Sequence, residues 1–453
     1  MRQIRLRDTL TGELQPLNPR DPGKVGIYAC GPTVYGRIHV GNARPYLIFS
    51  LLKRFLEHEG YDVTFVANVT DVNDKIYDAA RDQGVPSEQL AREMTAAYVE
   101  DTDGLAIGRP DAEPKASETI DAIVELIQAL VDGGHAYPSG GDVYFRVGSF
   151  PEYGKLSNRA LEDMRQGEDE ADERLKEAPQ DFALWKAHKE GEDTDWPSPW
   201  GRGRPGWHIE CSAMAEQILG EDFDIHGGGA DLIFPHHENE IAQTEAARGK
   251  PLARIWMHNG MVELDEEKMS KSLGNIRSLR GALEAKGRDA LVMYFIGGHY
   301  RGPLAFSEEA LDEGGRAVER VRDLIRRLDP DAGPSEGMDE YAERFFDALA
   351  DDFNTAEARS VLFEWISEAN RRIDAGEWVG IGRLEEMLYM LGLEGLLVGD
   401  EAADPEAERL LREREEARGA RDFATADAKR DELAARGWEV RDTPQGPQLV
   451  RRG

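Results

Sequence analysis

The first 110 residues alternate between short apolar runs and longer segments with helical periodicity. Val25–Ala29 and Asp62–Val66 are apolar runs that predict buried strands. Amphipathic patterns over residues 46–58 and from Ser87 to about Asp103 predict helices, the second of them capped by Ser87. Strands that alternate with helices form a parallel sheet with helices on its faces. We therefore expect an α/β fold with a Rossmann-type parallel sheet.

The strand pattern is interrupted and then resumes. Residues 111–206 predict a helix from about 117 to 131, a strand at 142–147 and a solvated, charge-rich loop at 162–177. After this stretch we expect a strand at His208–Glu210, from which Cys211 leads into a helix that ends at Leu219. A further strand at Phe223–His226 is expected to break at Gly227–Gly229. A helix from His236 to Arg248 and a strand at Ile255–His258 follow. Residues 111–206 are therefore interpreted as an insertion within one sheet domain.

The pattern after Pro303 is almost entirely helical. Ser307 is expected to cap a helix that ends near Leu328. Further helices are predicted near 338–350, 355–373, 383–395, 405–418 and 422–435. The chain closes with strand signals at Trp438–Val440 and Leu449–Val450, around a turn at Pro444–Pro447. This pattern predicts an all-α bundle followed by a small helix–hairpin unit.

Length and composition limit the class of protein. A chain of 453 residues exceeds one hydrophobic core, so several domains are expected. It has no run of 18 apolar residues, and Met1–Arg5 leads into polar sequence, so we expect neither a membrane span nor a signal peptide. Two cysteines form no disulfide framework, which fits a reducing cytoplasm and leaves both thiols for chemistry or a metal.

The charge is strongly acidic and unevenly distributed. A net charge of −33 argues against a nucleic-acid partner, because phosphate binding needs lysine and arginine. Residues 405–453, however, carry eleven acidic and eleven basic side chains and are neutral. A nucleic-acid contact is therefore expected only locally, and the C-terminal unit is the place that permits it.

Cys30–Asn42 joins the first predicted strand to the first predicted helix. In open α/β sheets, ligands bind at the carboxyl ends of the strands, and the start of a helix offers free N–H groups that suit a phosphate. The stretch contains His39-Val40-Gly41-Asn42, in which the glycine allows close approach of a ligand to the backbone. A tight turn with an incidental histidine explains this stretch alone equally well.

A second motif, Lys268-Met269-Ser270-Lys271-Ser272, follows the sheet pattern. Two lysines three positions apart form a flexible cationic clamp for a transferring phosphoryl group. The motif alone is compatible with a solvated loop. Together, the His39–Asn42 and Lys268–Ser272 stretches resemble the two signatures of class I aminoacyl-tRNA synthetases. Asn42 replaces the usual second histidine of the first signature and, as another hydrogen-bond donor, is interpreted as a variant.

Four further side chains suggest a metal site. His236 and Glu240 are four positions apart, hence on one face of a predicted helix, but this spacing alone is common. Cys30 and Cys211 both follow predicted strands and are expected at one edge of the sheet. Two thiolates, an imidazole and a carboxylate can bind zinc tetrahedrally. Taken singly, each cysteine is better explained as an ordinary buried thiol.

Several long motifs in order resemble the cysteinyl-tRNA synthetase family over the whole chain. They are Tyr28–Tyr35, Gly206–Met214, Phe223–Gly229 and Phe234–Glu240. The resemblance implies a zinc ion, one per chain, bound by Cys30, Cys211, His236 and Glu240, with His237 not among the ligands. It implies that the substrate thiol binds this metal, which separates cysteine from serine.

The resemblance also implies the reaction and its residues. ATP and L-cysteine form cysteinyl-adenylate, which then acylates the terminal adenosine of cysteine tRNA, with Mg²⁺ on the phosphates. His39, Asn42, Lys268 and Lys271 are the implied catalytic residues, and the ATP site comprises His39, Gly41, Asn42, Gly228, Asp231 and Lys271. Thr70, Trp207 and His226 are implied to line the cysteine pocket, although packing explains Thr70 and Trp207 equally well. A cytoplasmic monomer without membrane contact is expected.

The resemblance divides the chain into six parts. Residues 1–110 and 207–265 are the two halves of the Rossmann catalytic domain, and 111–206 is the connective insertion. Residues 266–330 hold the lysine loop and the stem-contact helices, 335–398 the helical tRNA-binding bundle, where Asp352–Thr355 matches the family, and 405–453 the anticodon-reading unit.

The C-terminal unit offers specific side chains for tRNA. The expected phosphate contacts are Arg418, Arg421, Lys429, Arg430, Arg436, Arg451 and Arg452. Trp438 either stacks on an unpaired anticodon base or forms the core of the unit, and the core interpretation is favoured.

Two other functions stay open at this point. The cysteine ligase of mycothiol synthesis has a similar catalytic domain, but it lacks a full tRNA-reading C-terminus, and here the chain extends far beyond residue 335. A zinc-stabilised nucleotide-binding regulator would need no lysine clamp. Cysteine-dependent pyrophosphate exchange separates an enzyme from a regulator, and tRNA charging separates the two ligases.

Overall fold

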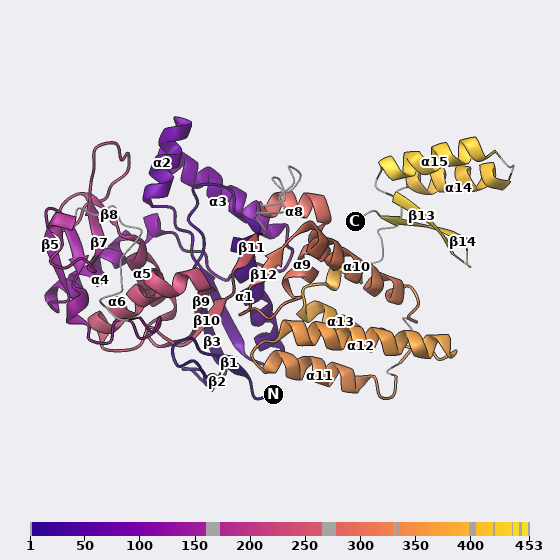
Figure 1. Cartoon of the computed structure of the whole chain (residues 1–453), viewed down its shortest axis with the longest axis horizontal. Helices are drawn as coiled ribbons and strands as arrows, with labels where there is room; N and C mark the ends of the chain where they lie inside the picture. The colour runs from indigo at the N-terminus through magenta and orange to yellow at the C-terminus, as the bar shows by residue number, and fades with distance from the viewer. Residues whose placement is uncertain are drawn as a thin grey trace.

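The computed structural model describes residues 2–159, 173–264, 278–329, 332–333, 335–397, 405–419, 422–436, 438–443 and 446–451. Figure 1 shows an elongated molecule with an antiparallel sheet at one end, a parallel sheet in the middle and helices beyond it. A separate C-terminal unit of two helices and a hairpin lies beside the helical end. The expected α/β fold with helical C-terminal domains is confirmed.

The central sheet has four parallel strands in the order β10–β9–β3–β4. They are β3 (Lys24–Ala29), β4 (Asp62–Ala67), β9 (Phe223–Gly229) and β10 (Ala253–Asn259). The middle pair, β3 and β9, comes from either side of residues 111–206, so the sheet is assembled from segments far apart in the chain. The carboxyl ends of these strands therefore bring the Cys30–Asn42 and Gly227–Gly229 stretches together.

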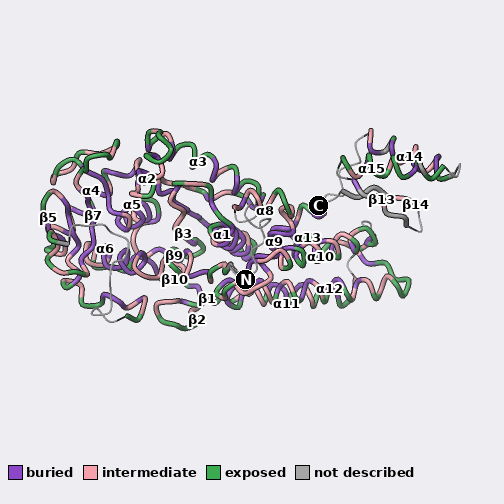
Figure 2. Tube along the Cα trace, turned by 45° about the horizontal axis from the view of Figure 1, so that its top comes forward, coloured by how far each residue is buried: buried purple, intermediate pink, exposed green. Residues whose placement is uncertain are grey.

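Both faces of this sheet are covered, as a parallel sheet requires. Ile27 and Phe65 point into the main hydrophobic core with helix α1 (Val40–His58). Their neighbours Tyr28 and Val66 point to the opposite face, into a second core formed with α5 (Trp207–Leu219) and α6 (Glu238–Arg248). Figure 2 shows this buried centre continuing into the helical domain.

The remaining elements flank the sheet. The first 110 residues also form the strand pair β1 (Arg5–Arg7) and β2 (Leu14–Pro16) and the helices α2 (Asp74–Gln83) and α3 (Ser87–Asp103). The antiparallel end contains α4 (Ile120–Asp132), β5 (Ala136–Ser139), β6 (Asp142–Phe145), β7 (Phe182–Ala187) and β8 (Gly203–Pro205). Most of the predicted loop at 162–177 lies outside the described residues, and Glu173–Leu175 forms a short 3₁₀ turn.

Beyond the central sheet, strands β11 (Val262–Leu264) and β12 (Leu304–Phe306) form a short parallel pair, and the first two helices of the helical end lie between them in the chain. Its helices are α8 (Leu279–Lys286), α9 (Arg288–Phe295), α10 (Glu308–Ile325), α11 (Asp339–Ala350), α12 (Thr355–Asp374) and α13 (Gly382–Met390). Ser307 caps α10 by accepting a hydrogen bond from Ala310 N–H, as its position predicts. None of the helices within the described ranges is long and apolar enough to cross a membrane.

The C-terminal unit consists of α14 (Pro405–Gly419), α15 (Phe423–Ala435), β13 (Trp438–Thr443) and β14 (Gly446–Arg451). Trp438 is buried in a small core with Ala407, Leu410 and Leu433. The core interpretation of Trp438 is therefore confirmed, and the stacking interpretation is wrong, since a ring needed inside this core cannot also stack on a base.

Several predicted element boundaries were wrong, among them that of the helix predicted near 383–395, which ends at Met390. Helix α1 starts at Val40 and not at residue 46, because His39 and Asn42 cap it there, and it continues through Pro45, which lies inside the helix and has no N–H to donate. His208–Glu210 belong to helix α5 and not to a strand, and β9 continues through its glycines. α6 starts at Glu238, while His236 lies in the π-helical turn Ile233–His237.

The predicted cap of α3 was also wrong. Pro86 is the residue before the helix, and Ser87 is its first residue. The N–H and hydroxyl of Ser87 donate hydrogen bonds to Asp193 in the chain after β7, which ties α3 to that segment.

Candidate functional site

His39 and Asn42 form a reciprocal cap at the start of α1. Asn42 N–H donates to His39 Nδ1 and His39 N–H donates to Asn42 Oδ1, each at 3.3 Å. Both side-chain acceptors are thereby occupied by backbone donors. The neutral His39 ring must carry its proton on Nε2, and the Asn42 amide must turn its Nδ2 away from the cap. The turn thus presents two N–H donors, and burial lowers the pKa of His39, which keeps the ring neutral.

Two glycines of the first stretch are required by close contacts. A Cβ on Gly41 would lie 2.9 Å from His39 Nδ1, so a side chain there would displace the histidine ring. A Cβ on Gly31 would lie 1.7 Å from the carbonyl oxygen of Asn68, at the end of β4. The chain can therefore turn from β3 into the cap only with glycine at both positions.

This turn borders a cavity of about 360 Å³ at the carboxyl ends of the strands. His39, Gly41 and Asn42 line one side, and Gly229 and Asp231 line another. The charge of Asp231 acts on His39, where it opposes the effect of burial on the pKa. Gly228 does not itself line the cavity, but a Cβ there would lie 2.8 Å from Leu232, which does. Lys268 and Lys271 lie outside the described residues.

Beside the cavity, Cys30, Cys211, His236 and Glu240 bring their ligand atoms within 4.8 Å of one another. Cys30 follows β3, Cys211 comes from α5, His236 from the π-helical turn, and Glu240 from α6. His236 Nε2 lies 3.0 Å from Glu240 Oε1, and Cys30 Sγ lies 3.5 Å from the same oxygen. This set of two sulfurs, one nitrogen and one oxygen, buried except for the half-buried Cys30, fits a tetrahedral zinc ion.

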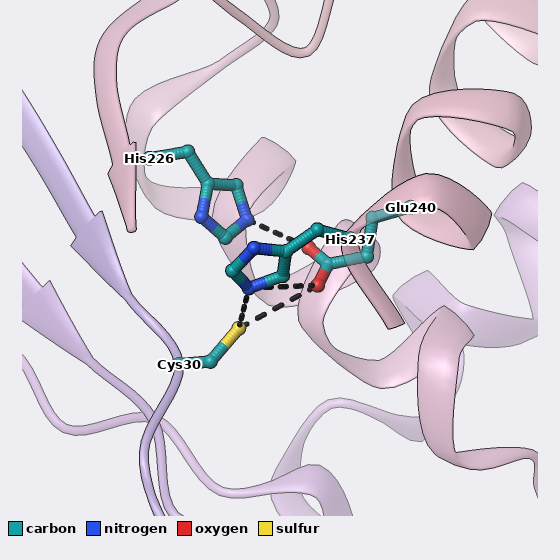
Figure 3. Close-up of side chains that lie close together, drawn as sticks. All are labelled: Cys30, His226, His237 and Glu240. Carbon is teal, nitrogen blue, oxygen red and sulfur yellow. Dashed lines mark hydrogen bonds and ion pairs between the residues drawn. The ribbon is translucent and has the colours of Figure 1, made fainter. Parts of the chain in front are cut away.

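A second set of four shares two of these residues. Cys30, His226, His237 and Glu240 also bring ligand atoms within 4.8 Å (Figure 3). In this set His226 Nε2 lies 2.7 Å from Glu240 Oε2, and His237 Nε2 lies 3.3 Å from Cys30 Sγ. The set with both cysteines is the better zinc site, because zinc favours thiolates and because His226 and His237 then serve as hydrogen-bond donors to two of its ligands.

The charges of the cluster suit a cation. Burial alone would raise the pKa of Glu240, but His226 and His236 hold it well below its usual value. The pKa of Cys211 is lowered to about 6, first by a hydrogen bond from Cys30 and then by His236. Desolvation raises the pKa of the Cys30 thiol well above its usual value. A bound divalent cation would favour the deprotonated form of both.

A chain of hydrogen bonds supports Cys30 from behind. His237 Nδ1 lies 2.8 Å from His258 Nε2, and His258 Nδ1 lies 2.7 Å from Thr9 Oγ1. With Cys30 as a thiolate acceptor, every donor in this chain must point toward the sulfur, from the Thr9 hydroxyl to His237 Nε2–H. Burial lowers the pKa of His258 to about 3 and that of His237 as well, so both rings are neutral.

Sequence patterns gave no signal for this supporting chain. Thr9 precedes the sheet by many residues, and His258 is one polar residue at the end of an apolar strand. His208 Nδ1 lies 2.9 Å from His236 Nδ1, and His236 turns its own Nε2 toward Glu240 in the cluster. The sequence pattern had placed His208 on a strand. Buried histidines at the ends of apolar elements are the only sequence signal that could have indicated it.

Of the three residues that the family resemblance assigned to the cysteine pocket, only Trp207 lines the cavity. The Trp207 ring stacks on His236 with centroids 4.3 Å apart and lines the cavity. His226 is fully buried and touches Glu240. Thr70 is 1% exposed, accepts a hydrogen bond from Asn68 and does not line the cavity. The structure therefore brings Trp207 and the metal cluster together at the cavity, with His226 behind them.

Three parts of the chain match known protein families. Residues 16–316 match the family described as "tRNA synthetases class I (C) catalytic domain", and residues 344–393 match the DALR domain. Mycobacterium tuberculosis methionyl-tRNA synthetase with methionyl-adenylate has the same fold, with a TM-score of 0.58 at 18% identity over 82% of this chain and 88% of that one. The matched catalytic-domain family and the fold are those of a class I aminoacyl-tRNA synthetase.

Full-length relatives narrow the class. The chain is 46% identical to the cysteine–tRNA ligase of Brevibacillus brevis over 99% of its own length and 100% of the relative. It is 47% identical to the cysteine–tRNA ligase of Halorhodospira halophila over 99% of both. Residues 400–451 match the description "Cysteinyl-tRNA ligase anticodon binding domain". The chain belongs to the cysteine–tRNA ligase family.

Proposed function

We propose that the protein activates L-cysteine with ATP, as cysteinyl-adenylate, and transfers the cysteine to the terminal adenosine of cysteine tRNA. The observation that carries this proposal is the position of Cys30, Cys211, His236 and Glu240 beside the cavity that His39 and Asn42 line. A site for a thiol and a site for a nucleotide are thus adjacent. The family relation supports a monomer that acts in the cytoplasm.

The cap on α1 accounts for ATP binding. His39 Nε2–H and Asn42 Nδ2–H point away from the cap and can donate to phosphate or ribose oxygens, at the positive end of a 19-residue helix. Asp231, on the opposite wall, can accept from a ribose hydroxyl or an amino group. Lys268 and Lys271, which follow β11 in the chain, would stabilise charge on the departing pyrophosphate. ATP brings Mg²⁺ with its phosphates.

The cysteine side depends on the cluster. Zinc held by Cys30, Cys211, His236 and Glu240 would prefer a thiolate to an alcohol and favour loss of the thiol proton. A pocket without a metal would separate cysteine from serine poorly, because they differ by one atom. Trp207 stacks on His236 and lines the cavity, so its ring can restrict the position of a substrate between the cluster and the nucleotide.

The chain from Thr9 to Cys30 gives a testable effect on the metal. A His237→Leu variant should lower zinc affinity by roughly 10- to 100-fold, the usual effect of removing a hydrogen-bond partner of a ligand. His237→Gln should lose less zinc affinity, because the amide N–H of glutamine can still donate to Cys30 Sγ. Competition with a chelator measures both affinities, and equal zinc affinity in the wild type and in His237→Leu would rule out this supporting role.

The C-terminal unit is proposed to contact the anticodon. Lys429 pairs with Glu413, Arg430 with Asp427, and Arg436 lies 3.8 Å from Glu406. Of the basic residues expected to bind phosphate, these three are therefore partly neutralised within the unit. Arg421 and Arg452 lie outside the described residues, as does the side chain of Arg451.

Truncation after residue 400 should separate the two steps of the reaction. Cysteine activation should stay nearly intact, because the cavity, the cluster and the main core are built upstream. tRNA charging should fall at least about tenfold, since loss of even one arginine contact to a base costs roughly 1–3 kcal/mol. The salt dependence of tRNA binding should also become shallower. Unchanged charging across several salt concentrations would contradict the anticodon role.

One experiment separates this proposal from a ligase that joins cysteine to a sugar amine. The full chain is incubated with ATP, radiolabelled cysteine and either a cysteine tRNA transcript or the amino sugar. The proposal predicts labelled tRNA and no labelled sugar. Labelled sugar with uncharged tRNA would contradict it, and a lack of cysteine-dependent activation would leave only a nucleotide-binding regulator.

A further inference from the structure

The fully buried Arg44 connects the ATP cap to a loop of the helical end. It lies on α1, two residues after Asn42. Its guanidinium donates to three backbone carbonyls, those of Gly260 at 2.6 Å, Gly302 at 2.8 Å and His299 at 3.0 Å. The loop His299–Gly302 lies between α9 and β12. Arg44 therefore fixes this loop to the helix that carries His39 and Asn42.

The same loop shapes one wall of the ATP cavity. Gly260 N–H donates to the Tyr300 carbonyl at 2.8 Å, and a Cβ on Gly260 would lie 2.1 Å from the Gly302 oxygen. The next two residues, Met261 and Val262, line the cavity with Gly260. A Cβ on Gly41 would lie 3.8 Å from the Val262 Cβ, so this wall stands directly against the cap. Movement of the loop would change the shape of the cavity at the cap.

From its other side the loop is held by Asp352, between α11 and α12 of the helical domain. The Asp352 carboxylate accepts hydrogen bonds from Tyr300 OH at 2.8 Å and Arg301 Nε at 2.6 Å. It also accepts from Arg7 N–H at 2.7 Å, and His299 Nε2 lies 3.4 Å away. Asp352 is only 4% exposed. Tyr300, Arg301 and the Arg7 N–H therefore all donate to one buried carboxylate.

The backbone at this point is in a rarely used conformation. Asp352 has φ +63° and the next residue, Phe353, has φ +44°. Two consecutive non-glycine residues in the left-handed region are unfavourable. Such conformations persist where surrounding contacts determine them, and they concentrate at functional positions. Here the strained corner aims the carboxylate at the loop, while Phe353 enters the main core.

We propose that Asp352 is a positioning residue for cysteine activation. From the helical domain it fixes the loop His299–Gly302, and through that loop it sets the Gly260–Val262 wall against His39 and Asn42. Docking of the helical domain on the catalytic domain thereby determines the geometry of the ATP cavity, even when no tRNA is bound. This inference rests on the proposed cysteine activation, whose rate reports the geometry.

Asp352→Asn tests the carboxylate without disturbing the backbone, because asparagine tolerates a positive φ better than other non-glycine residues. Its Oδ1 can still accept from Arg7 and Tyr300, but the pair with Arg301 is lost. Cysteine-dependent ATP–pyrophosphate exchange by the full chain, without tRNA, should show kcat reduced by about 10- to 100-fold, the effect expected of a displaced site. KM for cysteine should be unchanged, since other elements build the cysteine side.

The matched control is Asp351→Asn. Asp351 is the neighbouring residue, is 57% exposed at its side chain and pairs with Arg5 on the surface. This variant should exchange like the wild type. If Asp352→Asn is folded and its kcat equals that of the wild type, Asp352 merely attaches the domain and the proposal is wrong. An equal rise in KM for cysteine and ATP without a change in kcat would also overturn it.

Arg301→Gln provides a second variant in case Asp352→Asn does not fold. It removes the same pair and leaves the other bonds of Asp352 in place. Its exchange kcat should fall similarly, and the double variant should be no slower than the slower single variant, because both act through one contact. A normal rate in Arg301→Gln would contradict the proposal. A wild-type protein without any cysteine-dependent exchange would instead refute the proposed function.

Discussion

A Cys211→Ser variant is expected to lose its zinc and most of its ability to use cysteine. Cys211 lies in α5, packed between the sheet and α6, so a serine of nearly the same size can replace it there. A hydroxyl oxygen is a poor zinc ligand where a thiolate is lost. We expect kcat/KM for cysteine activation to fall at least about 100-fold, the upper end of what loss of a ligand's hydrogen-bond partner causes.

This variant also separates the two sets of possible ligands. The set Cys30, His226, His237 and Glu240 does not include Cys211, so a zinc ion bound there would survive the change. Metal analysis and exchange kinetics on the same sample measure the effect. Ser212→Ala, the next residue on the same buried helix, is the matched control and should keep metal and activity. Full zinc content with a normal KM for cysteine in Cys211→Ser would show that the set with both cysteines is the wrong one.

The second large effect is expected from Asn42→Asp. The aspartate keeps an oxygen to accept the His39 N–H, so the cap on α1 persists. A carboxylate in the first turn of a helix is favourable for its stability. The change nevertheless replaces the Nδ2 donor that faces the cavity with a negatively charged oxygen, which would repel a phosphate. Exchange kcat should fall by about 100- to 1,000-fold, as when a donor to a developing anion is removed.

Asn42→His is the companion variant. It restores the residue that is usual at this position in class I signatures, and it should keep exchange within a few-fold of the wild type, because imidazole can also accept from His39 N–H and donate outward. Thermal unfolding should show Asn42→Asp at least as stable as the wild type. Normal exchange in Asn42→Asp would mean that the amide does not face the nucleotide and that the cap is only structural.

The sequence predicted those elements correctly whose apolar pattern is compatible with a single type of secondary structure. The strands Val25–Ala29 and Asp62–Val66 are apolar because both faces of the sheet are covered, and the structure has them as β3 and β4 with one residue added to each. Boundaries failed where function overrides local preference. Gly41, Asn42 and Pro45 make the start of α1 a poor helix sequence, yet the cap with His39 requires it to be helical.

The motifs predicted the candidate ligand residues, but they did not predict the residues that hold these ligands and the cavity in place by hydrogen bonds. Cys30, Cys211, His236 and Glu240 do meet, although Cys211 arrives on a helix instead of following a strand. Single residues on remote elements, such as Thr9, Arg44 and Arg301, carry no pattern by themselves. Their roles depend on tertiary hydrogen bonds between segments up to hundreds of positions apart, which periodicity and spacing do not encode.

We propose that this chain selects cysteine by its thiol at a zinc ion held by Cys30, Cys211, His236 and Glu240. The most direct test is ATP–pyrophosphate exchange with cysteine or serine, on protein depleted of metal and then titrated with zinc. The account predicts that exchange with cysteine rises with zinc and levels off at one ion per chain, while serine supports no exchange. Full exchange with cysteine in metal-free protein, or equal exchange with serine, would contradict it.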